Sequence, residues 1–171
     1  MSFKEYLKTI ETFFGKDVVQ SLKRIPRLYW AVYRAYLQKI KIEEKTYPIS
    51  FDGGWEEDLN TVFINKGKFL TLGARLIVLA HELTHSRQKK VKATNKLTYV
   101  KINLHNEYEA FLESFKVCRE AKEDPGDYAY LYDRYCNYGI DGLRYSIYRK
   151  GQCVADFYKS YYEKDYEEIK R

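Results

Sequence analysis

One pentapeptide in the sequence has the residue types and the spacing to hold a metal ion, His81-Glu82-Leu83-Thr84-His85. Two histidines four residues apart lie one turn apart on the same face of a helix, so both imidazoles can reach a single ion. Glu82 directly follows the first histidine and points about 100° around the helix. Its carboxylate can therefore reach a water on the metal instead of binding the metal itself.

This spacing predicts a zinc ion and the hydrolysis of a peptide bond. Zinc would lower the pKa of its bound water to about 7. Glu82 would take the proton as the water attacks a peptide carbonyl, and would return it to the leaving amine. The pattern arises by chance on the order of once in a few hundred chains of this length. The alternative is that both histidines are hydrogen-bonded interior residues that bind no metal, and the neighbouring residues must distinguish the two interpretations.

A catalytic zinc ion needs three protein ligands and an open fourth position, so a third donor must come from elsewhere in the chain. The candidates downstream are His105, Glu107, Glu109 and Glu113. A helical wheel places one apolar face at Leu104, Tyr108, Phe111, Phe115 and Cys118. Glu107 falls at the margin of this face, Glu109 and Glu113 fall nearly opposite, and His105 lies about a quarter-turn outside. We therefore predict His81, His85 and Glu107 as the zinc ligands.

Two long helices are predicted to position these residues, at 72–88 and at 101–121, the second ended by 124–126. An apolar stripe on the first helix lies away from the histidines and anchors it in a core; it consists of Leu72, Leu76, Leu79, Ala80 and Leu83. Ile77 and Val78 are apolar on the histidine side. The histidines are therefore expected to face an interior cleft.

The remaining segments predict an α+β fold that is predominantly helical, with a small β-sheet. Apolar spacing indicates helices at 3–14, 17–24 and 27–40, and strands at 47–51 and 61–64 around a turn at 52–54. Tyrosine stripes follow at helical spacing near 128–138 and 154–161, which we interpret as core packing. No repeat or low-complexity linker divides the 171 residues, which favours a single domain over 1–171.

The arrangement resembles the glutamate-zincins, in which H-E-x-x-H is followed on a later helix by a glutamate ligand. Glu107-Tyr108-Glu109-Ala110 matches the E-x-x-A form seen in CAAX-processing peptidases. Closer still is a resemblance to the zincin-like domain of bacterial extracellular contractile injection systems and their toxins. It covers roughly residues 45 to 115, including the lead-in 63–69 and Gln88, which matches the glutamine that soon follows the motif there.

The resemblance implies a zincin-like metallopeptidase domain with its sheet beside the motif helix. It also implies that a strand next to the site binds an extended peptide by edge pairing, for which 61–64 is our candidate. An oxyanion-stabilising Tyr, His or Arg is expected, but the 18 tyrosines leave the choice open. One position departs from several glutamate-zincins: Phe111 stands where an aspartate orients a zinc histidine, so the supporting partners of the histidines are unassigned.

Composition disfavours nucleic-acid binding, a cysteine-based site and membrane insertion. The net charge is +6, but Lys and Arg are scattered, so we interpret them as a solvated face and expect no nucleic-acid partner. The three cysteines, Cys118, Cys136 and Cys153, contain no C-x-x-C pair, which disfavours a disulfide framework or a thiolate zinc site. No signal peptide or transmembrane run is evident. We expect a soluble protein, cytoplasmic as synthesised, whose export would use a non-classical or injection route.

Two other hypotheses stand beside a zinc endopeptidase acting on a protein or peptide. One is a non-catalytic zincin-fold module that serves as a structural or binding part of a secreted assembly, with zinc as a staple. The presence of Glu82 favours the enzyme, because a structural metal needs no general base. The other is a basic binder of nucleic acid or membrane surfaces, which rests on net charge alone.

Overall fold

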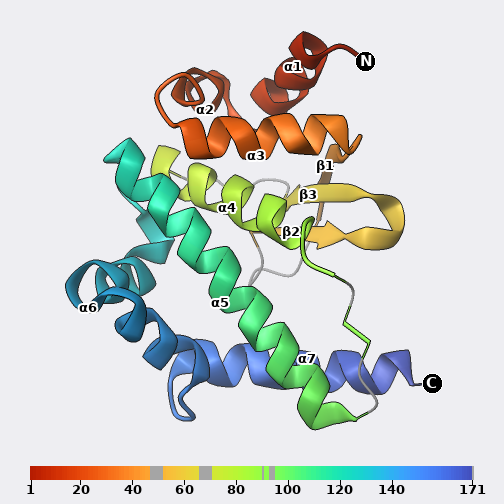
Figure 1. Ribbon diagram of the computed structural model, residues 1–171, viewed down its shortest axis with the longest axis vertical. Helices are drawn as coiled ribbons and strands as arrows, with labels where there is room; N and C mark the ends of the chain where they lie inside the picture. The colour runs from red at the N-terminus through yellow and green to blue at the C-terminus, as the bar shows by residue number, and fades with distance from the viewer. Residues whose placement is uncertain (47–51, 66–70, 90, 93–94, 171) are drawn as a thin grey trace.

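The computed structural model describes residues 1–46, 52–65, 71–89, 91–92 and 95–170. These residues form an α+β fold that is predominantly helical, as predicted, with a small sheet at one side (Figure 1). The helices are α1 (Phe3–Phe14), α2 (Lys16–Ser21), α3 (Pro26–Leu37), α4 (Leu72–His85), α5 (Lys96–Ala121), α6 (Ala129–Tyr148) and α7 (Cys153–Ile169). The strands are β1 (Lys41–Lys45), β2 (Gly53–Glu56) and β3 (Thr61–Asn65), and two short 3-10 turns, η1 (Glu57–Leu59) and η2 (Gly126–Tyr128), complete the described elements.

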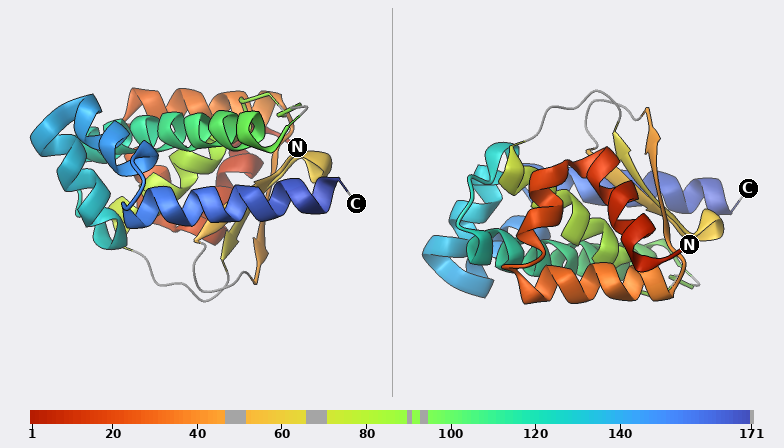
Figure 2. Two further views of the ribbon diagram at one scale, coloured as in Figure 1. Left: turned by 90° about the horizontal axis from the view of Figure 1, so that it is seen from below. Right: turned by 90° about the horizontal axis from the view of Figure 1, so that it is seen from above.

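The first three helices cover one side of α4. Ser2 caps α1 through a reciprocal pair of hydrogen bonds with Glu5, and Gly15 ends it. Pro26 stands in the first turn of α3, where its missing N–H costs nothing. Figure 2 shows α1, α2 and α3 gathered on the side of the molecule opposite α7. They provide the apolar surface against which α4 packs.

The sheet has the strand order β1-β3-β2, with β1 parallel and β2 antiparallel to β3. Strand β3 confirms the predicted strand at 61–64, and all five of its residues are buried. Its predicted role as a peptide-binding edge is wrong, because β3 is the central strand and both of its sides are already paired. The predicted strand at 47–51 lies outside the described residues.

Strand β2 corrects the prediction of a turn at 52–54. Gly53 and Gly54 favour a turn by their type, but both lie in the strand. A Cβ on Gly53 would stand 2.8 Å from the Phe63 carbonyl oxygen and 3.0 Å from Val78 Cγ1 of α4. The glycine therefore serves close approach of strand and helix. Strand β1 was not predicted, because only Ile42 of its five residues is buried and its conformation comes from pairing with β3.

Helix α4 is the central element and lies between α3 and α5 (Figure 1). Thr71 caps its first turn and also donates a hydrogen bond to the Asp124 carbonyl at 2.9 Å. Gly73 allows this approach, since a Cβ there would lie 2.1 Å from the Asp124 oxygen. The helix ends at His85, three residues before the predicted end at 88.

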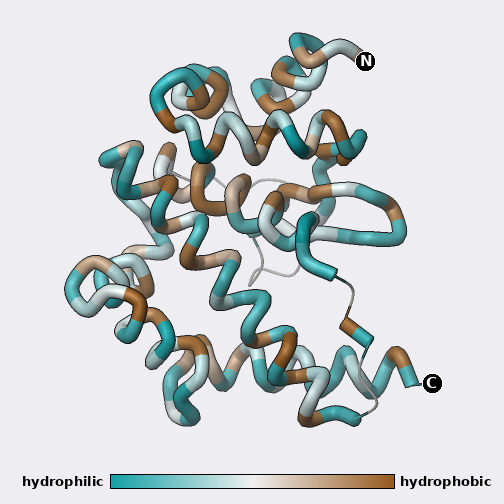
Figure 3. The backbone as a smooth tube through the Cα atoms, viewed as in Figure 1, coloured by the Kyte–Doolittle hydropathy of each residue, from teal (hydrophilic) through white to brown (hydrophobic). Residues whose placement is uncertain are grey.

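Helix α5 crosses α4 and carries the second predicted set of site residues. It begins at Lys96, five residues before the predicted start, because Asn95 caps it by accepting a hydrogen bond from the Thr98 N–H. Figure 3 shows hydrophobic and hydrophilic residues alternating along α5, as expected for a helix with one face in the core. Helices α6, which is kinked at Gly139, and α7 pack against the other side of α5.

Candidate metal centre

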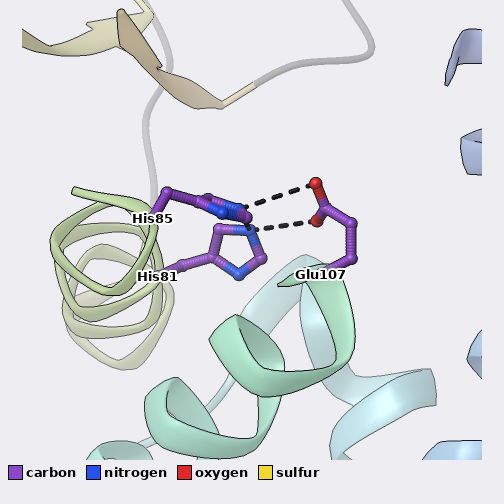
Figure 4. Close-up of side chains that lie close together, drawn as sticks. All are labelled: His81, His85 and Glu107. Carbon is purple, nitrogen blue, oxygen red and sulfur yellow. Dashed lines mark hydrogen bonds and ion pairs between the residues drawn. The ribbon is translucent and has the colours of Figure 1, made fainter. Parts of the chain in front are cut away.

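The two motif histidines lie on successive turns of α4 and face the same point. Their Nε2 atoms are 2.9 Å apart, and the rings meet edge to face (Figure 4). His81 is buried, and the side chain of His85 is 16% exposed. This separation suits two nitrogens that share a hydrogen bond or that bind one cation.

Glu107 of α5 reaches both histidines. Its Oε2 lies 3.3 Å from His81 Nε2, and its Oε1 lies 3.5 Å from His85 Nε2 (Figure 4). Glu107 is only 4% exposed, which agrees with its place on the margin of the apolar face of the helical wheel. The structure therefore brings together the three residues that the sequence predicts as zinc ligands.

The rejected candidates lie elsewhere, as the helical wheel predicts. His105 is exposed and contacts Glu109 and the hydroxyl of Tyr148. Glu113 makes ion pairs with Arg27 and Lys116. None of the three alternatives belongs to the cluster that could hold a metal within the described part of the chain.

The three donors fit a zinc ion. Zinc bonds of 2.0–2.1 Å at tetrahedral angles would place neighbouring ligand atoms about 3.3 Å apart. The two Nε2 atoms are 2.9 Å apart, and each lies 3.3 or 3.5 Å from a different oxygen of Glu107. One donor atom from each of the three residues lies within 4.8 Å of the others, which is close enough for one ion. Glu107 Oε2 is buried and has no hydrogen-bond partner among residues 1–46, 52–65, 71–89, 91–92 and 95–170. An unpartnered carboxylate oxygen in the interior is costly, and a cation would relieve that cost.

The charges of the cluster are strongly coupled. Burial would raise the pKa of Glu107, but His85 and His81 outweigh it and hold that pKa well below its usual range. Burial likewise opposes a charge on His85, yet the carboxylate of Glu107 raises the pKa of that imidazole to about 9. A proton on the His85 imidazole thus supplies positive charge beside Glu107, and a divalent cation would replace it.

Glu82 lies beside this cluster without belonging to it. It is 7% exposed, and burial is the main reason why its pKa is raised. The neighbouring strand approaches it closely: a Cβ on Gly53 of β2 would stand 3.4 Å from Glu82 Cγ. Glu82 thus lies on α4 next to β2, and its carboxylate interacts electrostatically with His81, His85 and Glu107.

The two histidines are supported in different ways. His85 Nδ1 is 2.7 Å from Gln88 Oε1, and the amide of Gln88 donates to the Asn106 carbonyl of α5 at 2.9 Å. His81 instead packs against the ring of Phe111, with centroids 4.5 Å apart, and its buried Nδ1 has no hydrogen-bond partner in the described chain. Within the described chain, the support of His81 from Phe111 is therefore apolar.

Tyrosines from distant segments also reach the site. Tyr162 of α7 donates a hydrogen bond to Glu107 Oε1, and Tyr158, one turn earlier, also interacts with that carboxylate. Tyr128 donates to Asp52 at 2.7 Å beside β2. Burial, followed by the nearby carboxylates, raises the pKa of all three hydroxyls, which keeps them protonated.

These hydroxyls are the residues that sequence reasoning missed. The predicted core packing is present in part: the rings of Tyr128 and Tyr158 pack against the apolar cluster around Phe111 and Phe115, whereas Tyr138 and Tyr161 of the same stripes are exposed. Helical spacing indicates which rings face inward, but it carries no signal for the partner of a hydroxyl 55 residues away along the chain. The contact between Gln88 and His85 could have been predicted, because residues three apart on a helix are neighbours.

Comparisons of the chain with protein-family models, with curated proteins and with solved structures found no match.

No helix in the described ranges combines the length and the apolar character that crossing a bilayer requires.

Proposed function

We propose that this protein is a zinc-dependent endopeptidase in which His81, His85 and Glu107 hold the metal and Glu82 is the general base. The observation that carries the proposal is the convergence of two imidazoles and a carboxylate from α4 and α5 beside a second, buried carboxylate. When bound, zinc supplies Lewis-acid chemistry that lowers the pKa of a coordinated water to about 7.

Glu82 performs the proton transfers. Its carboxylate accepts a proton from the water whose oxygen attacks the peptide carbonyl, and it then donates that proton to the amide nitrogen as the C–N bond breaks. The products are a carboxylate and an amine. Burial raises the pKa of Glu82, which makes its carboxylate a stronger base.

Strand β2 is the better candidate for binding an extended substrate. It is a terminal strand of the sheet, next to β3, and no other described strand pairs with its outer side. Its first residue, Gly53, lies beside Glu82. A peptide paired with β2 would therefore run past the general base, which is how edge pairing positions a scissile bond.

The test combines metal analysis with one substitution. Elemental analysis of the purified protein should give one zinc per chain. Glu82→Gln should keep the zinc while lowering cleavage of a mixed peptide library, read as new termini by mass spectrometry, by about 10²- to 10⁴-fold. Glu57→Gln, an exposed glutamate in η1, is the matched control and should cleave like the parent. A protein that binds no zinc, or a Glu82→Gln variant that cleaves as fast as the parent, would contradict the proposal.

Burial favours a second candidate, a non-catalytic module stapled by zinc. His81, Glu82 and Glu107 are each less than a tenth exposed, and structural zinc sites are closed. Acetohydroxamate separates the two candidates, because it binds zinc only where a coordination position is open. Zinc-loaded protein that binds acetohydroxamate supports the peptidase, whereas loaded protein that neither binds it nor cleaves any peptide supports the staple.

A further inference from the structure

The carboxylate of Glu107 has two oxygens in different surroundings. Oε1 accepts a hydrogen bond from the hydroxyl of Tyr162. Oε2 lies 3.3 Å from His81 Nε2 and, within the part of the chain that the structure describes, has no hydrogen-bond partner. Oε1 also lies 3.5 Å from His85 Nε2, so each oxygen faces one histidine. Within the described residues, only Oε1 is also held by a hydrogen bond from α7.

We propose that Tyr162 is a positioning residue that makes Glu107 bind the metal through Oε2 alone. The inference rests on the proposed function, since it concerns the same zinc site. A hydrogen bond to one carboxylate oxygen draws its electron density towards the donor and fixes the rotation of the group. The second oxygen then remains the stronger ligand.

Tyr162 is itself held in place from two sides. Its ring stacks on Tyr158, with centroids 6.2 Å apart and an angle of 17°, and meets the edge of Tyr99 at 6.5 Å. Tyr99 of α5 donates a hydrogen bond to Asp165, one turn beyond Tyr162 on α7. Helix α7 is thus tied to the same helix that carries Glu107, so the hydroxyl of Tyr162 is positioned before a metal arrives.

The binding mode of Glu107 decides how many positions remain on the metal. Two histidines and one carboxylate oxygen occupy three positions of a tetrahedral zinc ion and leave the fourth open. A carboxylate bound through both oxygens would add a donor and crowd that position. By holding Oε1, Tyr162 keeps the open position that hydrolysis requires.

Tyr162→Phe tests the proposal, because it removes the hydroxyl and keeps the ring. X-ray absorption of the zinc-loaded parent should show four ligand atoms, and the variant should show five as Oε1 joins. The dissociation constant for zinc, measured by competition with a chromogenic chelator, should rise about 10- to 100-fold. Tyr138→Phe, on an exposed tyrosine of α6, is the control and should change neither value.

A second variant separates the hydroxyl from the general packing of α7. Tyr99→Phe removes the hydrogen bond to Asp165 but leaves the hydroxyl of Tyr162. It should keep four ligand atoms on zinc. If Tyr99→Phe gives five ligand atoms as well, the effect belongs to the placement of α7 and the specific role of Tyr162 is overturned.

The outcomes distinguish this inference from the proposed function. A parent protein that binds no zinc overturns both. A parent that binds zinc, with a folded Tyr162→Phe variant of equal affinity and equal ligand number, overturns only the role of Tyr162. If Tyr162→Phe does not fold, the parent alone decides, because two-oxygen coordination by Glu107 in the parent contradicts the proposal.

Discussion

The two sides of α4 pack against different kinds of surroundings. On the side of α1, α2 and α3, the buried cluster is largely aliphatic and includes Ile10, Val18, Leu28, Val32, Leu76 and Leu79. On the side of α5 and α6, the cluster contains Ile77 of α4 but is richer in aromatic residues, with Tyr108, Phe111, Phe115 and Tyr135, and Tyr158 of α7 packs against it. The candidate metal site lies where α4 faces α5.

The difference separates two tasks within one small fold. The aliphatic side holds α4 by burial of apolar area, which is strong but has no direction. Tyrosine on the aromatic side combines an apolar ring with a hydroxyl that donates in a defined direction. Stability should therefore depend mainly on the first side, and the geometry of the site on the second.

The largest effect on stability should come from the aliphatic side. Leu79 is fully buried, so Leu79→Ala removes apolar burial and leaves a cavity. We expect the free energy of unfolding to fall by about 2–5 kcal/mol, measured by equilibrium urea denaturation of the metal-free protein. Leu37→Ala, at an exposed leucine of α3, should stay within about 0.5 kcal/mol of the parent.

Zinc affinity is the second measurement to make on Leu79→Ala and its control Leu37→Ala. In material that is still folded, Leu79→Ala should bind zinc like the parent, because Leu79 belongs to the aliphatic cluster. A loss of zinc affinity as large as that of a ligand variant would show that the two sides of α4 are not separable.

An intermediate effect should come from the support of His85. Gln88→Leu removes the hydrogen bond to His85 Nδ1 and the link from Gln88 to α5, so the dissociation constant for zinc should rise about 10- to 100-fold. Phe111→Leu, which keeps an apolar contact to His81, should raise it less. Competition with a chelator measures both. A stronger effect from Phe111→Leu would mean that packing, and not hydrogen bonding, positions the histidines.

The smallest effect should come from the ion pair between α2 and α4. The guanidinium of Arg75 contacts Asp17 at 2.5 Å and holds the pKa of that carboxyl below its usual value. A lowered pKa in the folded state contributes stability above the unfolded pKa, about 3.9, and loses it as the pH falls through the folded pKa. Because the side chain of Asp17 is half exposed, Asp17→Asn should cost at most about 1 kcal/mol at pH 7.

The loss of stability in Asp17→Asn should depend on pH in one direction. The difference in unfolding free energy between Asp17→Asn and the parent should shrink below about pH 4, where the parent carboxyl also becomes protonated in the unfolded state and then in the folded state. Added salt should reduce it at pH 7. A difference that grows at low pH would contradict the assigned ion pair.

The helices and the candidate ligands could be predicted because their signals are local. Apolar spacing correctly located α1, α3 and α4 within a few residues, and the helical wheel distinguished Glu107 from Glu109. The failures are in the sheet. Two adjacent glycines predict a turn, but Gly53 and Gly54 begin strand β2. Residues 61–64 were predicted as an edge strand, but β3 is central in the sheet. The order of strands in a sheet depends on contacts between distant segments, and the hydrophobic periodicity within one segment carries no information about them.

The amino-acid sequence by itself determined that two imidazoles share one face of a helix, that Glu82 stands beside them and that Glu107 turns inward. These relations follow from backbone hydrogen bonds that repeat every few residues, so spacing along the chain translates directly into position. Only the tertiary structure decided that Tyr162 reaches Glu107 and that β2 runs past Glu82. Those contacts join segments through the packing of the entire core, where shape and volume, and not distance along the chain, select the neighbours.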